Sequence, residues 1–314
     1  MMRTLLALLV LAAPALAAEP KTRTFRFTYE VTVNGLAPGE QARVWLPVPQ
    51  TTDDQEVIAI DMHFPVEAAL NTETRLGNQM FYLGTKADAD GSVPLKVVYT
   101  IKRKEVKGET DKGLQGMLDQ YLKFDPLSRP DGKQKLLLDG RKLPDDPMAK
   151  AKELYEIVNG MLRYAKDGTE WGRGDVDWVC DSKYGNCTDF HSLFIALARS
   201  EKIPARFEVG FGLPEKRGSG DVAGYHCWAK FKPEGKGWVP VDISEANKNP
   251  KMKDYYFGNL TEDRVTFSTG RDIVLAPKQD GPPLNFFVYP YVEVGGKPYP
   301  ADKMKRKFGY EDVK

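Results

Sequence analysis

The segment from residue 184 to residue 198 constrains the fold of this chain most, because a turn signal is followed at once by a buried helical pattern. Gly185 and Asn186 favour a turn directly before Cys187. Apolar residues then recur at helical spacing at positions 190, 193, 194, 195, 197 and 198. We therefore expect Cys187 in the first turn of a buried helix. The partial positive charge of a helix N-terminus favours a thiolate, so the pattern raises the hypothesis of a cysteine nucleophile.

A thiol nucleophile needs a base, and the base needs an orienting group. The strand expected over residues 225–231 places His226 on one face and Cys227 on the other. A hairpin with residues 238–243, if its turn is centred on Glu234, places Asp242 opposite His226, with the Cβ atoms roughly 5 Å apart. Asp242 would then orient His226, whereas a slip of one residue would put the two on opposite faces.

Each of these residues also has a less specific interpretation. Cys187 could be a buried structural thiol, His226 a strand histidine bonded to the backbone, and Asp242 an ordinary strand-end carboxylate. His191 is a rival base because it lies four residues after Cys187 on the expected helix. It is embedded in the apolar pattern, however, with no nearby group to orient it. We favour Cys187, His226 and Asp242 as the catalytic residues.

The N-terminus is typical of a cleavable export signal. Arg3 is followed by an apolar run over residues 5–13 and by the small-x-small sequence Ala15-Leu16-Ala17. We expect a signal peptide over residues 1–17 and a periplasmic or secreted mature protein without stable membrane insertion. Removing Arg3 leaves 44 of the 45 basic residues against 44 acidic ones, a balance that does not favour nucleic acid as a partner.

In the rest of the chain, the residue pattern changes near residue 105 from strands alone to a mixture of helices and strands. Alternating apolar residues over 25–31 and further short strand patterns predict an N-terminal antiparallel β-sandwich over residues 18–105. Residues 106–275 mix helix and strand patterns, with a helix opened by Asp146 and Pro147. A short helix is expected around residues 114–122. Residues 276–314 are expected to form a C-terminal β extension that packs on the core.

Four ordered motifs carry a resemblance to a known family. They are Gly-Asn-Cys187-Thr-Asp-Phe-His, Ile203-Pro-Ala-Arg206, Gly224-Tyr-His226-Cys-Trp228 and Gly237-Trp-Val-Pro-Val-Asp242. This set resembles the bacterial transglutaminase-like family over residues 112–272, most clearly over 171–246. The resemblance implies an α+β fold with a papain-like core, in which Cys187 lies on a helix and His226 and Asp242 lie on adjacent strands.

The other cysteines are assigned a structural role. An odd cysteine count in an exported chain leaves at least one thiol unpaired, and Cys180 with Cys227 is the candidate disulfide. A metal site built from these cysteines and histidines matches no zinc spacing that we recognise.

Asp189 is expected to bind free amides at the helix start. The backbone amide of Cys187 is the first oxyanion donor, and a second could come from Trp171, Trp178 or Tyr184.

These observations predict a thiol-dependent amide or isopeptide hydrolase, or an acyl transferase. It would act on extracytoplasmic proteins or peptides through a cysteine thioester and without a cofactor. The family resemblance does not separate hydrolysis from transfer to an amine. The alternative is a non-catalytic binding module of the same fold. The loop over residues 213–224 is expected either to overhang the cleft or to be a mobile surface connection.

Overall fold

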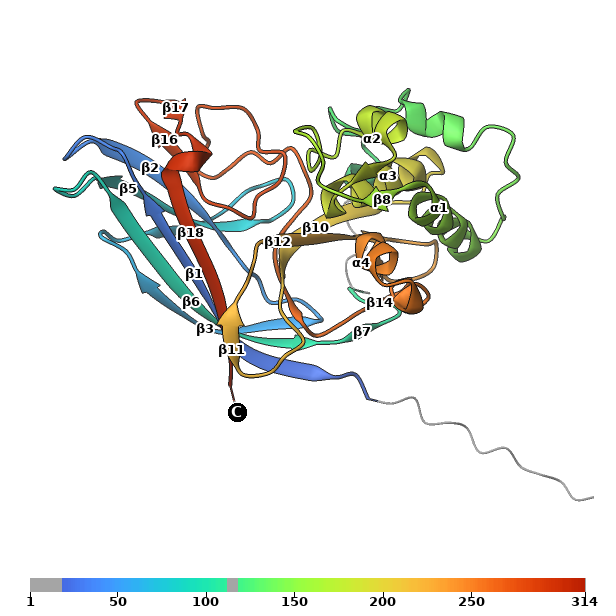
Figure 1. Cartoon of the computed structure of the whole chain (residues 1–314), viewed down its shortest axis with the longest axis horizontal. Coiled ribbons are helices and arrows are strands. Elements are labelled where there is room, and N and C mark those ends of the chain that lie inside the picture. Colours follow the sequence, from blue (N-terminus) through green and yellow to red (C-terminus); the bar gives the residue numbers. More distant parts are fainter. Residues whose placement is uncertain (1–18, 112–117, 314) are drawn as a thin grey trace, which may run out of the picture.

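The computed structural model describes residues 19–111 and 118–313. It contains a two-sheet β-sandwich beside a third sheet that is covered by helices (Figure 1). This arrangement confirms the α+β fold class expected from the sequence. The signal peptide expected over residues 1–17 lies outside the described residues, as does the first part of the helix expected around residues 114–122. The remainder of that segment forms the 3₁₀ helix η1, Leu118–Tyr121.

Within the described ranges, no helix is long and apolar enough to cross a membrane.

The first sheet of the sandwich follows the predicted alternation of its longest strand. In β1, residues 25, 27, 29 and 31 are buried apolar or aromatic side chains. The strands are antiparallel neighbours in the order β11–β18–β1–β6–β3. Their bounds are β1 Thr22–Val33, β3 Gln55–His63, β6 Val93–Lys104, β11 Ser219–Asp221 and β18 Met304–Asp312.

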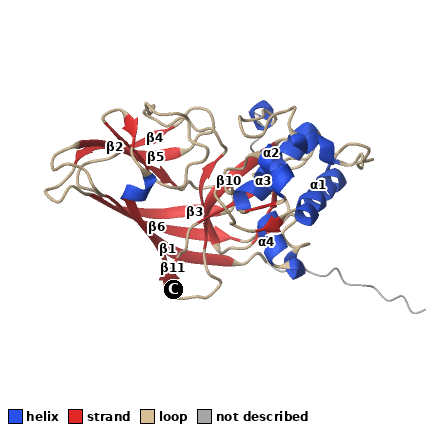
Figure 2. Ribbon diagram, turned by 45° about the horizontal axis from the view of Figure 1, so that its top comes forward, coloured by secondary structure: helices blue, strands red, loops and turns tan. Residues whose placement is uncertain are grey.

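The second sheet lies against the first (Figure 2). Buried side chains from both sheets share one hydrophobic core, whereas Trp45 of β2 and Met80 of β5 belong to a second, smaller cluster. Tyr99 of β6 donates a hydrogen bond from its hydroxyl to the carbonyl oxygen of Pro47 at 3.4 Å. The antiparallel order is β17–β16–β2–β5–β4. The bounds are β2 Gln41–Val48, β4 Ala69–Thr72, β5 Gln79–Lys86, β16 Tyr291–Val294 and β17 Lys297–Pro298.

The C-terminal residues, expected to pack on the core, pair with both sheets of the sandwich. β16 pairs with β2, and β18 pairs with β1 along nine residue pairs. The segment over 213–224 differs from the expected loop, because it contributes β11 to the edge of the first sheet. A local strand pattern does not encode its distant partner, which explains this difference. The domain boundaries at residues 105 and 275 stay a prediction.

The third sheet and four helices form the part of the chain that carries the resemblance. Its antiparallel order is β13–β12–β10–β15. The strands are β10 Ala205–Gly212, β12 Tyr225–Phe231, β13 Val239–Val241 and β15 Arg264–Thr269, and the helices are α1 Pro147–Met161, α2 Val176–Ser182, α3 Cys187–Ser200 and α4 Ile243–Lys248. Short elements complete the chain, namely β7 Val106–Lys107, β8 Arg163–Tyr164, β9 Tyr184–Gly185, β14 Asn259–Leu260, η2 Lys133–Leu137, η3 Pro250–Met252 and η4 Ala301–Lys303.

Helix α3 lies at the centre of this part and packs against β12 and β10. Every residue from 187 to 198 is buried, as the predicted apolar pattern requires. Helix α1 also begins where expected, because the Asp146 carboxylate accepts a hydrogen bond from the amide of Ala149 at 2.8 Å and Pro147 occupies the first helical position.

Aromatic side chains join the third sheet to the sandwich. The ring of Phe211 on β10 lies 5.0 Å from that of Phe27 on β1 and 4.5 Å from that of Phe308 on β18. Phe267 on β15 lies 5.6 Å from Tyr99 on β6. Such ring pairs stabilise a contact beyond their buried area. The C-terminal strand therefore helps to hold the sheet that carries His226.

We predict that Phe308→Ala lowers the free energy of unfolding by about 3–5 kcal/mol, because a buried ring leaves a cavity between two sheets. Chemical denaturation followed by tryptophan fluorescence measures this change. The matched control is Lys307→Ala on the exposed face of the same strand, for which we expect a change within about 0.5 kcal/mol. Equal effects of the two substitutions would contradict the role given to β18.

Candidate active site

Cys187 occupies the first turn of α3, as the sequence predicts. The side chain of Asn186 caps the helix by accepting a hydrogen bond from the amide of Thr188 at 2.8 Å, and Asp189 returns a bond by accepting from the amide of Asn186 at 2.8 Å. This reciprocal capping fixes the direction of the first turn. Cys187 is 3% exposed, so its sulfur lies at a buried, positively polarised helix end.

Asp189 also fixes the loop before the helix. Its carboxylate accepts hydrogen bonds from the amides of Gly172 at 2.7 Å and Gly174 at 2.9 Å. Gly174 has a φ of 66°, and a Cβ there would lie 2.3 Å from the hydroxyl of Ser192, so glycine is required. The expectation that Asp189 binds free amides is confirmed.

His226 and Asp242 meet through a 2.7 Å hydrogen bond between Nε2 and Oδ2. The predicted register was wrong by two residues, because Ala229 lies opposite Val241 and the turn is centred on Gly235, whose φ is 72°. A shift of two keeps each side chain on its face. Asp242 therefore approaches His226 from a diagonal rather than a directly opposite position.

Asp242 is held by groups from its own helix as well. It caps α4, and its Oδ1 accepts hydrogen bonds from the amide of Glu245 at 3.1 Å and the hydroxyl of Ser244 at 3.2 Å. Its carboxylate is completely buried. Burial opposes its ionisation, but the positive charge of His226, the hydrogen bond from His226 and the positive charge of Arg264 hold the pKa of Asp242 far below its usual range.

The pKa shifts of Cys187 and His226 favour the thiolate and imidazolium forms of these two side chains. Because Nε2 of His226 binds Asp242, Nδ1 is the nitrogen left for its hydrogen bond with Cys187. Burial disfavours the imidazolium, yet the charge of Asp242 and hydrogen bonds with Asp242 and Cys187 raise the pKa of His226 to about 10. Burial likewise opposes the thiolate, but hydrogen bonds with Cys227 and His226 and the charge of His226 lower the pKa of Cys187 well below its usual value.

His191 has no free nitrogen to act as a base. Its Nδ1 lies 2.7 Å from the carbonyl oxygen of Cys187, and its Nε2 accepts a hydrogen bond from the amide of Ile243 at 3.0 Å. Nδ1 must therefore carry the proton of a neutral ring. Burial lowers the pKa of His191, which agrees with that state. This completely buried side chain ties the turn that holds Cys187 to the start of α4.

The other two cysteines, which were the candidates for a disulfide, are not bonded to each other. All three cysteines are free. The sulfur of Cys227 lies 3.8 Å from Oγ1 of Thr188 and forms a hydrogen bond with Cys187. Cys180 is half-buried on α2, where burial and the nearby Asp177 and Asp181 raise its pKa to about 11. Sequence spacing alone did not reveal that Cys227 faces the helix that carries Cys187.

Two of the three aromatic residues proposed as oxyanion donors bind other groups. The indole nitrogen of Trp171 donates to the carbonyl oxygen of Gly168 at 3.0 Å, and the hydroxyl of Tyr184 donates to that of Asp167 at 3.3 Å. The ring of Trp178 packs edge-on against Tyr184.

Among residues 19–111 and 118–313, no group of three or more His, Cys, Asp or Glu side chains is arranged to hold a metal ion.

Tyr225 is a site residue that the sequence analysis missed. Its hydroxyl accepts a hydrogen bond from Nδ2 of Asn186 at 2.9 Å and lies 2.9 Å from Oγ1 of Thr188. It therefore contacts the residues on both sides of Cys187. The alternation of β12 could have indicated this position, because Tyr225 lies two residues before Cys227 on the face toward α3.

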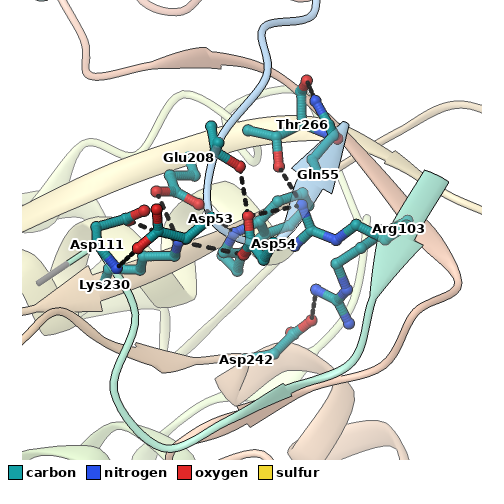
Figure 3. A network of polar contacts seen from close by, with 12 residues as sticks. Asp53, Asp54, Gln55, Arg103, Asp111, Glu208, Lys230, Asp242 and Thr266 are labelled. Carbon is teal, nitrogen blue, oxygen red and sulfur yellow. Dashed lines mark hydrogen bonds and ion pairs between the residues drawn. The ribbon is translucent and has the colours of Figure 1, made fainter. Parts of the chain in front are cut away.

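A network of buried charges lies behind the site (Figure 3). Asp54 binds Arg103 of β6 at 3.0 Å, and Lys230 of β12 bridges Asp54 and Asp111. Glu208 of β10 accepts a hydrogen bond from the indole of Trp228 at 2.7 Å. Four acidic and four basic side chains balance in this network, which comprises Asp54, Asp111, Glu208 and Asp242 with Arg103, Arg206, Lys230 and Arg264.

Comparison with known proteins relates this arrangement to one superfamily. A sequence model described as the transglutaminase-like superfamily matches residues 137–243. An uncharacterised protein of Haemophilus influenzae is 30% identical, with 100% of both chains covered. The uncharacterised protein YebA of Bacillus subtilis is 25% identical over 42% of this chain and 20% of its own length. The crystal structure of a proposed cysteine protease from Cytophaga hutchinsonii has a TM-score of 0.61 at 16% identity, covering 93% of this chain and 98% of that chain, which shows the shared fold.

We predict that denaturation without reductant exposes three free thiols per chain, because all three cysteines are unbonded. Titration with a chromogenic disulfide reagent counts them. In Cys180→Ala the count should fall by one. A bridge between Cys180 and Cys227 would instead give a count of one in the parent chain and a higher count in this variant.

Proposed function

The chain belongs to the transglutaminase-like superfamily, a family of thiol-dependent enzymes, and we propose that it cleaves or transfers an amide or isopeptide bond in proteins or peptides. The observation that carries this proposal is the hydrogen-bonded set of Cys187, His226 and Asp242. We further propose, from the signal predicted over residues 1–17, that it acts in the periplasm or outside the cell.

The first half of the proposed reaction forms a thioester. The Cys187 thiolate attacks the carbonyl carbon of the amide, and the carbonyl oxygen becomes an oxyanion. The backbone amide of Cys187 belongs to the first turn of α3, whose amides lack partners within the helix, so it can donate to that oxyanion. His226 then gives its Nδ1 proton to the leaving nitrogen as the carbon–nitrogen bond breaks.

The second half resolves the thioester. Water or a primary amine attacks its carbonyl carbon, and the now neutral His226 takes the proton from the attacking atom. The carbon–sulfur bond breaks, and the Cys187 thiolate and the His226 imidazolium are restored. Asp242 keeps Nε2 of His226 protonated in both halves, so that Nδ1 alone exchanges protons with the reacting groups.

The non-catalytic alternative predicts a different behaviour of the same residues. A binding module has no requirement for a depressed thiol pKa or for a buried carboxylate behind the histidine. The thiolate and imidazolium forms favoured for Cys187 and His226 therefore support the enzyme.

A labelled primary amine added with a glutamine-containing peptide separates hydrolysis from transfer, because transfer incorporates the label and hydrolysis does not.

We predict that iodoacetamide alkylates Cys187 rapidly from pH 6 to 8, because its pKa lies well below the usual value of about 8.5. The fast rate should fall at acid pH, where the thiolate gains a proton. It should change again near pH 10, where His226 loses its proton. Peptide mapping by mass spectrometry gives the rate constant at each cysteine.

His226→Ala should slow alkylation of Cys187 near neutral pH by about tenfold or more, because the imidazolium no longer stabilises the thiolate. Cys180→Ala is the matched control and should leave that rate unchanged. The assignment of Cys187 as the nucleophile would be contradicted if Cys187 were alkylated no faster than Cys180, or if its alkylation rate did not change in His226→Ala. Tight binding of a peptide by Cys187→Ala with no thioester formed by the parent chain would favour the binding module.

A further inference from the structure

Arg264, at the start of β15, directs its guanidinium at the Asp242 carboxylate. Its Nη1 donates to Oδ2 at 3.2 Å, and the same oxygen accepts Nε2 of His226 at 2.7 Å. Both Arg264 and Asp242 are buried, so water does not screen these contacts. One carboxylate oxygen therefore has two cationic donors, and these donors share its negative charge.

Arg264 makes few other contacts that would justify a buried charge. Its Nε has no hydrogen-bond partner among the described residues, and its guanidinium stacks 4.8 Å from the centre of the Trp228 ring. Burying a guanidinium costs free energy, and an apolar side chain often stabilises such a position as well or better. The bond to Asp242 is thus the contact that distinguishes arginine from an apolar residue here.

We propose that Arg264 is a positioning residue that acts through Asp242. By sharing Oδ2 with His226, it fixes the direction of the carboxylate and limits how tightly that carboxylate holds the proton of His226. The proposal rests on the proposed function only in taking His226 as the group that exchanges protons with the substrate. An imidazolium held too tightly is a poor acid toward a leaving nitrogen, and a nearby cation makes it more acidic.

The other titratable groups around the pair do not replace this charge. Glu245 of α4 carries its carboxylate 3.8 Å from Nε2 of His226, and its charge has the opposite sign to that of Arg264. Burial lowers the pKa of His191, which is neutral. Burial raises the pKa of the remaining neutral groups, which are the thiol of Cys227 and the phenols of Tyr155, Tyr164 and Tyr256. Arg264 is therefore the cation that acts on Asp242 beside His226.

The test is a direct titration of the His226 ring in the full chain. The sequence contains three histidines, so ¹⁵N-histidine labelling gives three imidazole spin systems, and His226→Gln assigns the one required. Titration in a Cys187→Ala background removes the thiolate, which makes the readout independent of whether Cys187 is a nucleophile. We expect Arg264→Met to raise the midpoint of His226 by about one pH unit, because a nearby cation is lost.

Two further variants keep the test decisive. Arg264→Gln is a second neutral variant in case the first does not fold, and Arg264→Lys restores the charge and should return the midpoint toward that of the parent. Arg103→Met is the matched control, because it removes a neighbouring buried guanidinium that binds Asp54 rather than Asp242. A midpoint that stays or falls in the neutral variants, or that moves equally in Arg103→Met, would overturn the proposal.

Discussion

The Asp242 carboxylate is the group on which the geometry of the site depends. Four hydrogen bonds reach its two oxygens, from His226, Arg264, Ser244 and the amide of Glu245. A completely buried carboxylate is stable only when such donors replace water. The donors come from β12, β15 and the first turn of α4, so the carboxylate can be satisfied only after these three elements have packed together. Its position therefore reports on the packing of the whole third sheet.

The buried charges extend that dependence into the sandwich. Arg103 of β6 and the carboxylate of Asp54 lie against Lys230 on the strand that carries His226. Breaking one partner of a buried ion pair leaves an uncompensated charge, which is far more costly than replacing the pair as a whole. The sandwich and the third sheet are thus joined by paired charges as well as by aromatic packing, and neither part can shift without separating opposite charges.

Local sequence patterns were enough to locate the elements that carry Cys187 and His226 but not the surroundings of these residues. Helical spacing after Cys187 located α3, and the alternation in β12 separated the face of His226 from that of Cys227. The predicted hairpin register was wrong by two residues, but His226 and Asp242 stayed on the same face of the sheet because side chains along a strand alternate with a period of two. Alternation could not tell that the face with His226, Trp228 and Lys230 is covered by protein rather than water, so the charge network was missed. Arg264 was missed for a related reason, because it approaches from a strand 22 residues beyond Asp242.

The pairing of β1 with β18 makes the first and last strands of the described chain neighbours. A growing polypeptide cannot complete this sheet until β18 has been made, since β18 lies between β1 and β11. Contacts of such large sequence separation form slowly during folding. The aromatic contacts that support β10 include Phe308, so the packing of the sheet that carries His226 also depends on β18. The topology thereby delays assembly of the candidate site until β18 has been made, and a chain that stopped before β18 would leave β1 as an open sheet edge.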